Sequence, residues 1–600
     1  MKKILYSAIV SLLIFSHPVY SENLTPINEQ TPKATEKASV LFFKSSFPIS
    51  GLNPNAESNQ RGAYYPGFRG SNQLLIYTRS YGERTGTNEY GLEAIIQNNR
   101  VVKTSGADST IPKDGYVISG NGKAKQWILK NLIEGAKVTI NFDKNEVESD
   151  ITPESYIYKA QTKYNDAKKE VYSLFKSNEK HTPNYIMSMN YLKTAKTDIS
   201  KAKKQFNQQN YDNVYKLSKM SIEASNKSFY GAVPYIADEF NGIWVRPTEK
   251  TPESITNTLE RIKNSGIKNV FLETYYHGYT IFPSKTMDKY SVTNQMQAFK
   301  GFDPLAVWVE EAHKRGLKVH VWFETFNVGS EPKTEKYKNI ISVHPDWANI
   351  QRRAYLDNSP SKSELENSSY FLDPANPCVQ KFLLELIDEI STNYKVDGIN
   401  LDYIRYPASL ADTFPNYLGS TWGYSQYARR EFKKMYGVDP ALLSRTEKCW
   451  EKWVNYRQNK VTEFVTKASA VIKQHNVMVT AVVFPNAYEA NIKKLQNWDV
   501  WAANGLVDAF TPLVLGGDTD LIRNYMSEMK QKVPANVKIY PGLFQPFNAE
   551  TPADLLKQFV TARSNGANGI MIFDYAHFTD EYKNALTTRA FSPIKIQETK

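Results

Sequence analysis

Acidic side chains recur in this 600-residue sequence from about residue 240 onward, each at the end of a short apolar run. The clearest case is VDGINLDYIRYP, from Val396 to Pro407, in which the run leads into Asp402 and then into an aromatic and cationic cluster. Similar runs lead into Glu273, Glu324 and Asp574. Two carboxyl groups in one pocket can hydrolyse a glycosidic bond: one protonates the leaving oxygen, and the other attacks the sugar carbon or activates water.

These carboxyl groups can meet only if the apolar runs are neighbouring strands of one sheet. A near-continuous apolar run between helical patterns is typical of a parallel strand buried on both faces. We therefore predict an α/β fold, a (β/α)8 TIM barrel over residues 231–595. A doubly wound open sheet is the alternative, and no glycine-rich phosphate loop supports it. Eight strand-like runs are found: Phe240 to Pro247, Lys268 to Gly278, Leu317 to Phe326, Val396 to Pro407, Val477 to Pro485, Val507 to Gly517, Val537 to Pro546 and Gly569 to Phe578.

A barrel places the carboxyl ends of its strands in a ring around one pocket. Four carboxylates in such a ring repel each other unless they are paired, protonated or bound to ligand, so the arrangement is costly for structure alone. For Asp402 taken singly, a helix cap or a pair with Arg405 is the alternative. The strand ends are Arg246, Glu273, Glu324, Asp402, Asn486, Thr511, Gln545 and Asp574.

Aromatic residues accompany these strand ends and could stack on sugar rings, although each one singly is more typical of barrel packing. The histidines are scattered, without the short spacing of a zinc-binding helix, so we predict neither a catalytic metal nor a cofactor. His320 and His577 could lie near the pocket, but ordinary strand and loop roles are the commoner alternative. The predicted substrate-binding residues are Arg246, Glu273, Tyr275, His320, Trp322, Tyr403, Arg405, Tyr406, Asn486, Gln545, Asp574 and Tyr575.

The first 230 residues differ in character from the predicted barrel. Residues 1–21 combine Lys2 and Lys3 with a short apolar stretch, which predicts an export signal cleaved after Ser21, with an uncleaved anchor as the alternative. Residues 22–37 are predicted to be a linker. Alternating short runs predict a mostly β accessory domain over 38–150, and apolar residues at helical spacing predict a small helical bundle or spacer over 151–230.

The composition, with 41% hydrophobic and 23% charged residues, is that of an ordinary globular protein. The net charge of +12 favours anionic partners such as cell-wall polymers, acidic glycans or a membrane surface, or it merely keeps the chain soluble. We find no nucleic-acid-binding motif and no transmembrane segment after the signal. The two cysteines, Cys378 and Cys449, allow at most one disulfide.

Two stretches resemble known families. Residues Gly91 to Ile128 resemble a segment of exported phosphodiester-glycosidase-like domains, without a carboxylate set that could be carried over. The barrel region, through FNGIWVRP, GLKVHVWF and VDGINLDYIRYP, resembles a bacterial exported glycosyl-hydrolase-like family, labelled family-10-like and formerly a domain of unknown function. Members often carry Asn after Trp-Phe on the third strand, where this chain has Glu324.

The resemblance implies an exported glycoside hydrolase, periplasmic or extracellular and cell-wall associated, that acts on a bacterial cell-wall or surface glycan. Peptidoglycan strands without stem peptides are the first expectation. By analogy with amylase-like barrels, Asp402 is the candidate nucleophile and Glu324 the candidate acid/base, with Glu273 and Asp574 in reserve. Arg246 and Arg405 would hold an anionic substrate group or lower the pKa of Asp402.

Two alternatives to this enzyme follow from the sequence. The first is a non-catalytic glycan-binding protein with a degenerate barrel. Two departures from the family pattern keep it open: Glu324, and Pro512-Leu513-Val514-Leu515 on the sixth strand, where members often carry Gln-x-Tyr-Trp. The second is a metal-dependent deacetylase, which lacks a convincing set of His and Asp ligands.

Overall fold

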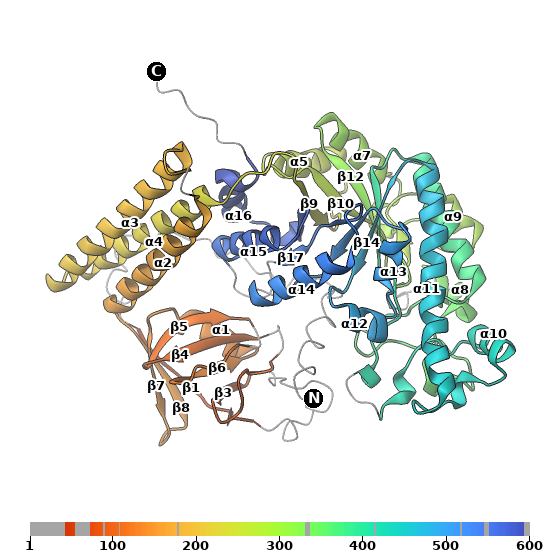
Figure 1. Cartoon of the computed structure of the whole chain (residues 1–600), viewed down its shortest axis with the longest axis horizontal. Helices are drawn as coiled ribbons and strands as arrows, with labels where there is room; N and C mark the ends of the chain where they lie inside the picture. Colours follow the sequence, from red (N-terminus) through yellow and green to blue (C-terminus); the bar gives the residue numbers. More distant parts are fainter. Residues whose placement is uncertain are drawn as a thin grey trace.

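The computed structural model describes residues 43–54, 72–87, 91–106, 109–176, 179–330, 337–412, 416–515, 519–544 and 551–592. The predicted signal, the predicted linker and Gln545 lie outside these residues. Three units follow one another along the chain: a sheet, a three-helix bundle and a larger α/β unit (Figure 1).

The first unit is a mostly antiparallel eight-stranded sheet that packs against one helix, α1 (Lys123–Asn131). Asn98 and Asn99 join two neighbouring strands and both have positive φ, as a tight hairpin turn requires. The strands, in the order β1-β8-β7-β5-β4-β6-β3-β2, are β1 (Phe43–Pro48), β2 (Gly51–Leu52), β3 (Leu74–Thr78), β4 (Leu92–Gln97), β5 (Arg100–Ser105), β6 (Gly115–Gly120), β7 (Lys137–Asn141) and β8 (Glu146–Ile151).

The bundle consists of α2 (Pro153–Leu174), α3 (Pro183–Asn207) and α4 (Tyr211–Ala232). The first half of α2 is tied to the β unit, because Glu154 pairs with Arg100 at 2.9 Å and Lys163 pairs with Glu134 at 2.9 Å. The second half of α2 contributes Val171 to the hydrophobic core that the bundle shares with the α/β unit. One continuous helix therefore contacts both neighbours, and the bundle lies on the side of the α/β unit that carries α15 and α16 (Figure 1).

The α/β unit is built on a curled parallel sheet with the order β16-β15-β14-β13-β12-β10-β9-β18-β17. The two ends of this order, β16 and β17, are consecutive in the chain and separated only by Tyr540 and Pro541. The strands are β9 (Phe240–Val245), β10 (Asn269–Tyr276), β12 (Lys318–Glu324), β13 (Gly398–Asp402), β14 (Met478–Val483), β15 (Ala509–Pro512), β16 (Lys538–Ile539), β17 (Gly542–Phe544) and β18 (Gly569–Phe573), and the short β11 (Tyr279–Thr280) pairs antiparallel with β10. The predicted mixed α/β architecture after a separate β unit is confirmed.

Helices alternate with these strands, and several begin with the sequence signal expected of a helix start. Thr251, Asp303 and Thr551 each precede a proline and accept a hydrogen bond from an amide in the first turn. The helices are α5 (Pro252–Lys263), α6 (Lys285–Lys289), α7 (Pro304–Lys314), α8 (Ile340–Val343), α9 (Pro377–Asn393), α10 (Gln426–Tyr436), α11 (Lys448–Gln474), α12 (Ala487–Glu489), α13 (Trp498–Ala503), α14 (Thr519–Lys532), α15 (Pro552–Ser564) and α16 (Asp580–Ala585).

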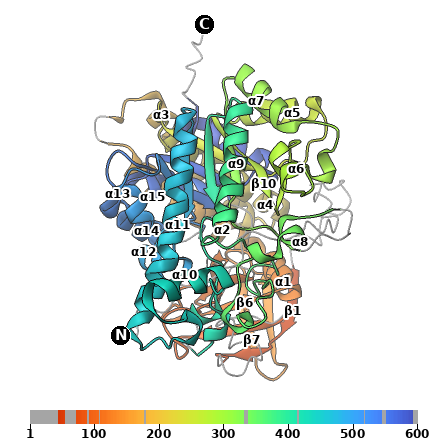
Figure 2. The same cartoon turned by 90° about the vertical axis from the view of Figure 1, so that its right-hand side faces the viewer.

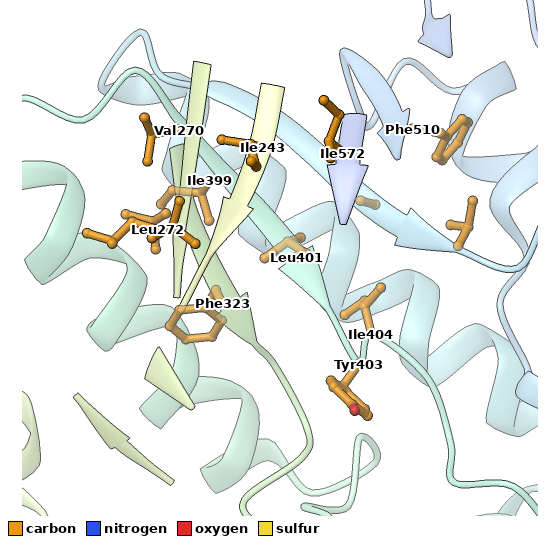
Figure 3. Packing of buried hydrophobic residues seen from close by; sticks show 14 of the residues in the cluster. Ile243, Val270, Leu272, Phe323, Ile399, Leu401, Tyr403, Ile404, Phe510 and Ile572 are labelled. Carbon is orange, nitrogen blue, oxygen red and sulfur yellow. The ribbon is translucent and has the colours of Figure 1, made fainter. Parts of the chain in front are cut away.

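Both faces of the sheet are apolar, as the continuous apolar runs predict. Toward the helices, Ile399 and Leu401 of β13 join Val270 and Leu272 of β10 in one large cluster (Figure 3). The long helices α9 and α11 lie side by side over this face (Figure 2). On the inner face, a second cluster contains Trp244, Phe271, Trp322, Met571 and Phe573. The sheet is therefore filled on the inside by large side chains.

Two further observations concern the described part of the chain. None of its helices combines the length and the apolar character that crossing a bilayer requires. Cys378 and Cys449 are both free thiols, so the disulfide that the sequence allowed is not formed between them.

A buried ion pair fixes the start of the α/β unit against its last helices. Arg563 on α15 donates to both carboxylate oxygens of Glu239, at 2.8 and 2.6 Å, and to the Pro234 carbonyl oxygen at 2.9 Å. We expect Arg563→Ala to lower the free energy of unfolding by about 3–5 kcal/mol, because Glu239 is left charged and buried. Arg523→Ala is the matched control: Arg523 pairs with Asp520 on the surface, so about 1 kcal/mol or less is expected. Equal losses in denaturant titrations would contradict this assignment.

Candidate active site

The carboxyl ends of four neighbouring strands, β9, β10, β12 and β13, bring Arg246, Glu273, Glu324 and Asp402 together. Glu324 and Asp402 are register partners on β12 and β13. The indole nitrogen of Trp322, two residues before Glu324 and on the same face of β12, donates to Asp402 Oδ2 at 2.8 Å. Both carboxyl groups therefore point to the inner face of the sheet.

Glu273 is the carboxylate with a full counter-charge. Arg246 donates to it through Nε at 2.5 Å and through Nη2 at 2.9 Å. Burial raises the pKa of Glu273, and Arg246 opposes that rise. For Arg246, burial lowers the pKa but Glu273 more than offsets it, so the pKa is raised and the guanidinium stays charged. Arg246 is 32% exposed whereas Glu273 is fully buried, so the cluster reaches solvent at Arg246.

Asp402 is held by two hydrogen bonds, and no cationic side chain of the described residues forms an ion pair with it. Besides Trp322, the backbone N–H of Tyr403 donates to Asp402 Oδ1 at 2.6 Å. Burial raises the pKa of Asp402 to about 6, and these two hydrogen bonds only partly offset it. Asp402 is therefore ionised near neutral pH and protonated below about pH 6.

Glu324 is the least compensated member of the cluster. The backbone N–H of His277 donates to its Oε2 at 2.9 Å, and its Oε1 has no hydrogen-bond partner among the described residues. Burial, followed by the nearby charge of Glu273, raises the pKa of Glu324 well above its ordinary value. The two neighbouring carboxyls therefore differ in their surroundings, because Asp402 accepts two hydrogen bonds whereas Glu324 accepts only one, which favours the neutral form of Glu324.

Two residues with left-handed backbone supply the amides that hold these carboxyls. Tyr403 has φ 47° and His277 has φ 53°. His277 and Gly278, which also has positive φ, form the tight turn between β10 and β11. Non-glycine residues adopt this conformation at a cost of about 1 kcal/mol or more. His277 was not among the predicted site residues, although its place before a glycine between two tyrosines marks a turn.

A polar layer lies directly below the cluster on the inner face. The Asn400 amide donates to Thr480 Oγ1 at 2.8 Å and to Thr511 Oγ1 at 3.0 Å, and its oxygen accepts from Trp244 Nε1 at 3.4 Å. Thr511, taken from the sequence as a strand end, therefore belongs to this layer. The hydrogen bonds of Asn400 fix the strand from which Asp402 emerges.

Arg405 and its neighbours lie beside the cluster without pairing with it. Arg405 donates to both oxygens of Glu366, at 2.9 and 3.1 Å, and its guanidinium lies 4.9 Å from the centre of the Tyr403 ring. Its charge lowers the pKa of Asp402 less than the two hydrogen bonds do. Tyr406 is buried further along the same loop. Glu366 was missed, because it lies 39 residues before Arg405 and no local pattern marks it.

Other predicted residues have partners outside the cluster. A register irregularity in β10 after Glu273 pairs Tyr275 with Phe323, on which its ring stacks at 4.8 Å. His320 is buried deeper in the sheet, stacked on Phe271, and burial lowers its pKa to about 4. The Asn486 side chain caps α12 and donates to Glu528 at 3.2 Å.

The last strand contributes one carboxylate near the cluster. Asp574 is 6% exposed, its charge raises the pKa of Glu273, and its Oδ1 lies 2.6 Å from His577 Nδ1. Tyr575, next in the chain, instead lies under the Arg261 guanidinium at 5.6 Å. Among the residues that the structure describes, no group of three or more His, Cys, Asp or Glu is arranged to hold a metal ion.

Comparison with known proteins identifies relatives of the α/β unit. The model of a family described as "Glycosyl hydrolase-like 10" matches residues 235–554. "Glycosyl hydrolase DigH" of Escherichia coli (strain K12) is 28% identical over 307 residues, which are 48% of this chain and 65% of that protein. "Glycosyl hydrolase YngK" of Bacillus subtilis (strain 168) is 23% identical over 233 residues, 35% of this chain and 42% of that protein. The chain therefore spans only part of the length of these relatives.

One solved structure illustrates the distance to characterised folds. The PgaB (BpsB) glycoside hydrolase domain from Bordetella bronchiseptica superposes with a TM-score of 0.44 at 14% identity, covering 60% of this chain and 100% of that domain.

The raised pKa of Glu324 predicts a specific pH dependence of stability. The folded protein retains a proton at Glu324 that the unfolded chain releases above about pH 4.5, so this residue lowers stability as the pH rises. Glu324→Gln removes the titration, and we expect the variant to gain stability relative to the native protein between pH 4 and pH 8. Denaturant titrations across this range test it, with the exposed Glu310→Gln as control. A constant difference would show that Glu324 is ionised when folded.

Proposed function

The chain belongs to the glycosyl hydrolase-like 10 family, and we propose that it is an exported glycoside hydrolase that cleaves O-glycosidic bonds of a bacterial cell-wall or surface glycan. The observation that carries the proposal is the unequal pair of carboxyls at neighbouring strand ends. Glu324 lies in surroundings that favour its neutral form, and Asp402 is ionised near neutral pH. A glycosidase needs one neutral and one ionised carboxyl.

In the proposed mechanism, Glu324 is the general acid and Asp402 the nucleophile. Glu324 gives its proton to the leaving oxygen while Asp402 attacks the sugar carbon. Water then hydrolyses the covalent intermediate, with Glu324 accepting its proton. Glu324 and Asp402 are register partners on neighbouring parallel strands, whose backbones lie about 5 Å apart, so both carboxyls can reach one glycosidic bond, as this route requires. The Glu273–Arg246 pair supplies fixed charges beside the reacting atoms.

We also propose that the sheet is a complete (β/α)8 barrel, closed through residues 538–544. On one side of this segment, the Tyr540 amide donates to the Phe510 carbonyl oxygen at 2.9 Å. On the other side, the Met571 amide donates to the Pro541 carbonyl oxygen at 3.0 Å. A segment that bonds to both ends of the strand order supports closure, which would set the four strand ends on one rim.

Peptidoglycan strands without stem peptides are the first substrate to test. The names of the matched relatives support a hydrolase acting on glycans. The net charge of +12 supports an anionic polymer as partner. The export signal predicted over residues 1–21 supports a periplasmic or extracellular, cell-wall-associated location, and an S-layer-related protein of Niallia circulans, 28% identical over 27% of this chain and 11% of that protein, agrees with a surface role.

Loss of the nucleophile provides the direct test. We expect Asp402→Asn to lower the release of soluble sugar fragments from purified, peptide-stripped peptidoglycan by more than about a thousandfold. Asparagine keeps the hydrogen-bond acceptor for Trp322 but cannot form the covalent intermediate. The matched control is Asp373→Asn, because Asp373 is also fully buried with a pKa that burial raises to about 6, but it bonds to Ser425 away from the cluster.

The outcomes of this test separate an enzyme from a binding protein. Normal activity in Asp402→Asn, with melting confirming a folded protein, would refute the assignment of Asp402. Polymer captured by both proteins without any release of fragments would favour the glycan-binding alternative.

The pH dependence of the native enzyme gives an independent test. Because the pKa of Asp402 is raised to about 6 and only the ionised form attacks, we expect kcat/KM to fall as the pH drops through about 6. Measuring initial rates between pH 4 and pH 9 checks it. An acid limb near pH 4, the ordinary range for aspartate, would contradict the role of Asp402.

A further inference from the structure

A cavity of about 200 Å³ lies beside the loop that follows Asp402. Tyr406, only four residues after Asp402, is one of its lining residues. The aromatic side chains Trp422, Trp450 and Tyr488 also line it. Aromatic walls of this kind suit the apolar faces of sugar rings.

The cavity contains a buried cation, Arg457, that forms no ion pair among the described residues and feels the Asp412 carboxylate only at a distance. Arg457 lines it, is only 6% exposed, and donates to the carbonyl oxygens of Trp422 at 2.8 Å and Trp453 at 3.4 Å. Burial lowers the pKa of Arg457, and the Asp412 charge offsets this only in part. A buried charge is costly unless an opposite charge accompanies it, so an anionic ligand would complete this environment.

Other groups around the cavity favour the same kind of ligand. Arg445 is exposed, lies 5.9 Å from the centre of the Trp450 ring and donates to the Ala411 carbonyl oxygen at 2.9 Å. Lys493 also lines the cavity, but its charge is paired with Glu489 at 3.1 Å. Asp412, whose pKa burial raises to about 6, is the one acidic side chain in the lining, against the two arginines. The lining therefore carries more positive than negative charge.

The lining also includes one exposed aromatic ring, Tyr488, and one enclosed hydroxyl, that of Tyr406. Tyr488 is 62% exposed although it is a large aromatic residue, and Ile492, one turn later, is 49% exposed. The hydroxyl of Tyr406 is buried without a hydrogen-bond partner among the described residues. An exposed ring beside two arginines that form no ion pair among the described residues provides stacking and charge recognition together.

We propose that this cavity is a subsite for a glycan residue that bears a carboxylate, with the sugar ring on Tyr488 and the carboxylate at Arg445 and Arg457. The inference rests on the proposed function, because it places a neighbouring part of the same polymer next to the Asp402 loop. It adds that the glycan must carry carboxylates at intervals, so a neutral polymer of the same sugars is a poorer ligand.

Calorimetric binding to the Asp402→Asn chain tests the subsite without cleavage. The probes are a short peptide-free peptidoglycan fragment, whose sugars carry lactyl ether carboxylates, and the same fragment with its carboxylates reduced to alcohols. We expect reduction to weaken binding about tenfold or more, the size of one charge-assisted hydrogen bond. Arg445→Gln, chosen because Arg445 is exposed and its loss spares the fold, should weaken binding of the carboxylate form alone by a similar factor.

Matched variants separate charge, stacking and general effects. Tyr488→Ala should weaken both forms alike, whereas Tyr427→Ala and Arg430→Gln, on the exposed side of α10 and outside the cavity, should change neither. Equal affinity for the two fragments, no effect of Arg445→Gln, or no binding of either fragment would overturn the inference. Carboxylate-dependent binding without hydrolysis by the native protein would refute the proposed enzyme but keep the subsite. Hydrolysis by the native protein together with equal binding of both fragments would support the proposed enzyme and refute the subsite.

Discussion

The structure of the site depends on one constraint: three carboxyl groups are buried side by side where water cannot separate their charges. Coulomb repulsion between buried like charges is large, so all three cannot be ionised without compensation. Each carboxyl has a different solution. Glu273 has a bidentate guanidinium, Asp402 has an indole and an amide, and Glu324 has one amide and an unpaired oxygen. Unequal compensation is what makes chemically similar groups suitable for different roles.

The backbone is shaped to provide this compensation. The pairing of β12 with β13 continues without interruption up to Glu324 and Asp402. The chain then turns sharply at Tyr403. The turn at His277 does the same at the end of β10, and in both places the amide of the left-handed residue points at a carboxyl. The conformational cost of about 1 kcal/mol at each turn is met by the packing of the sheet, whose inner and outer faces are both filled. Below, the hydrogen-bonded Asn400 fixes the position of β13.

The sequence predicted the parts of the site that follow from strand periodicity and failed where a distant or irregular contact decides. Arg246, Glu273, Glu324 and Asp402 were found because each ends an apolar run, and parallel strands align such ends. In a regular strand, Tyr275 would lie on the same face as Glu273. The register irregularity between them turns the Tyr275 side chain to the other face. Asn486 was assigned to the pocket, yet a short polar side chain before a helix readily caps it instead. The partner of Arg405 could not be predicted, because Glu366 comes from a loop outside the strand and helix pattern.

That long-range pair explains what Arg405 does for the site. The Glu366 carboxylate accepts hydrogen bonds from Nη1 and Nη2 of Arg405 and from the Ala408 amide, the last at 2.7 Å. Glu366 therefore holds the loop after Asp402 at two points. The Tyr406 amide donates to the Lys494 carbonyl oxygen at 3.1 Å, which adds a third. The same loop supplies the amide that holds Asp402 at one end and the wall of the aromatic cavity at the other. A loop fixed in this way holds the carboxyl pair and the cavity at a constant distance from each other. The proposed binding of two neighbouring sugars of one polymer requires such a fixed distance.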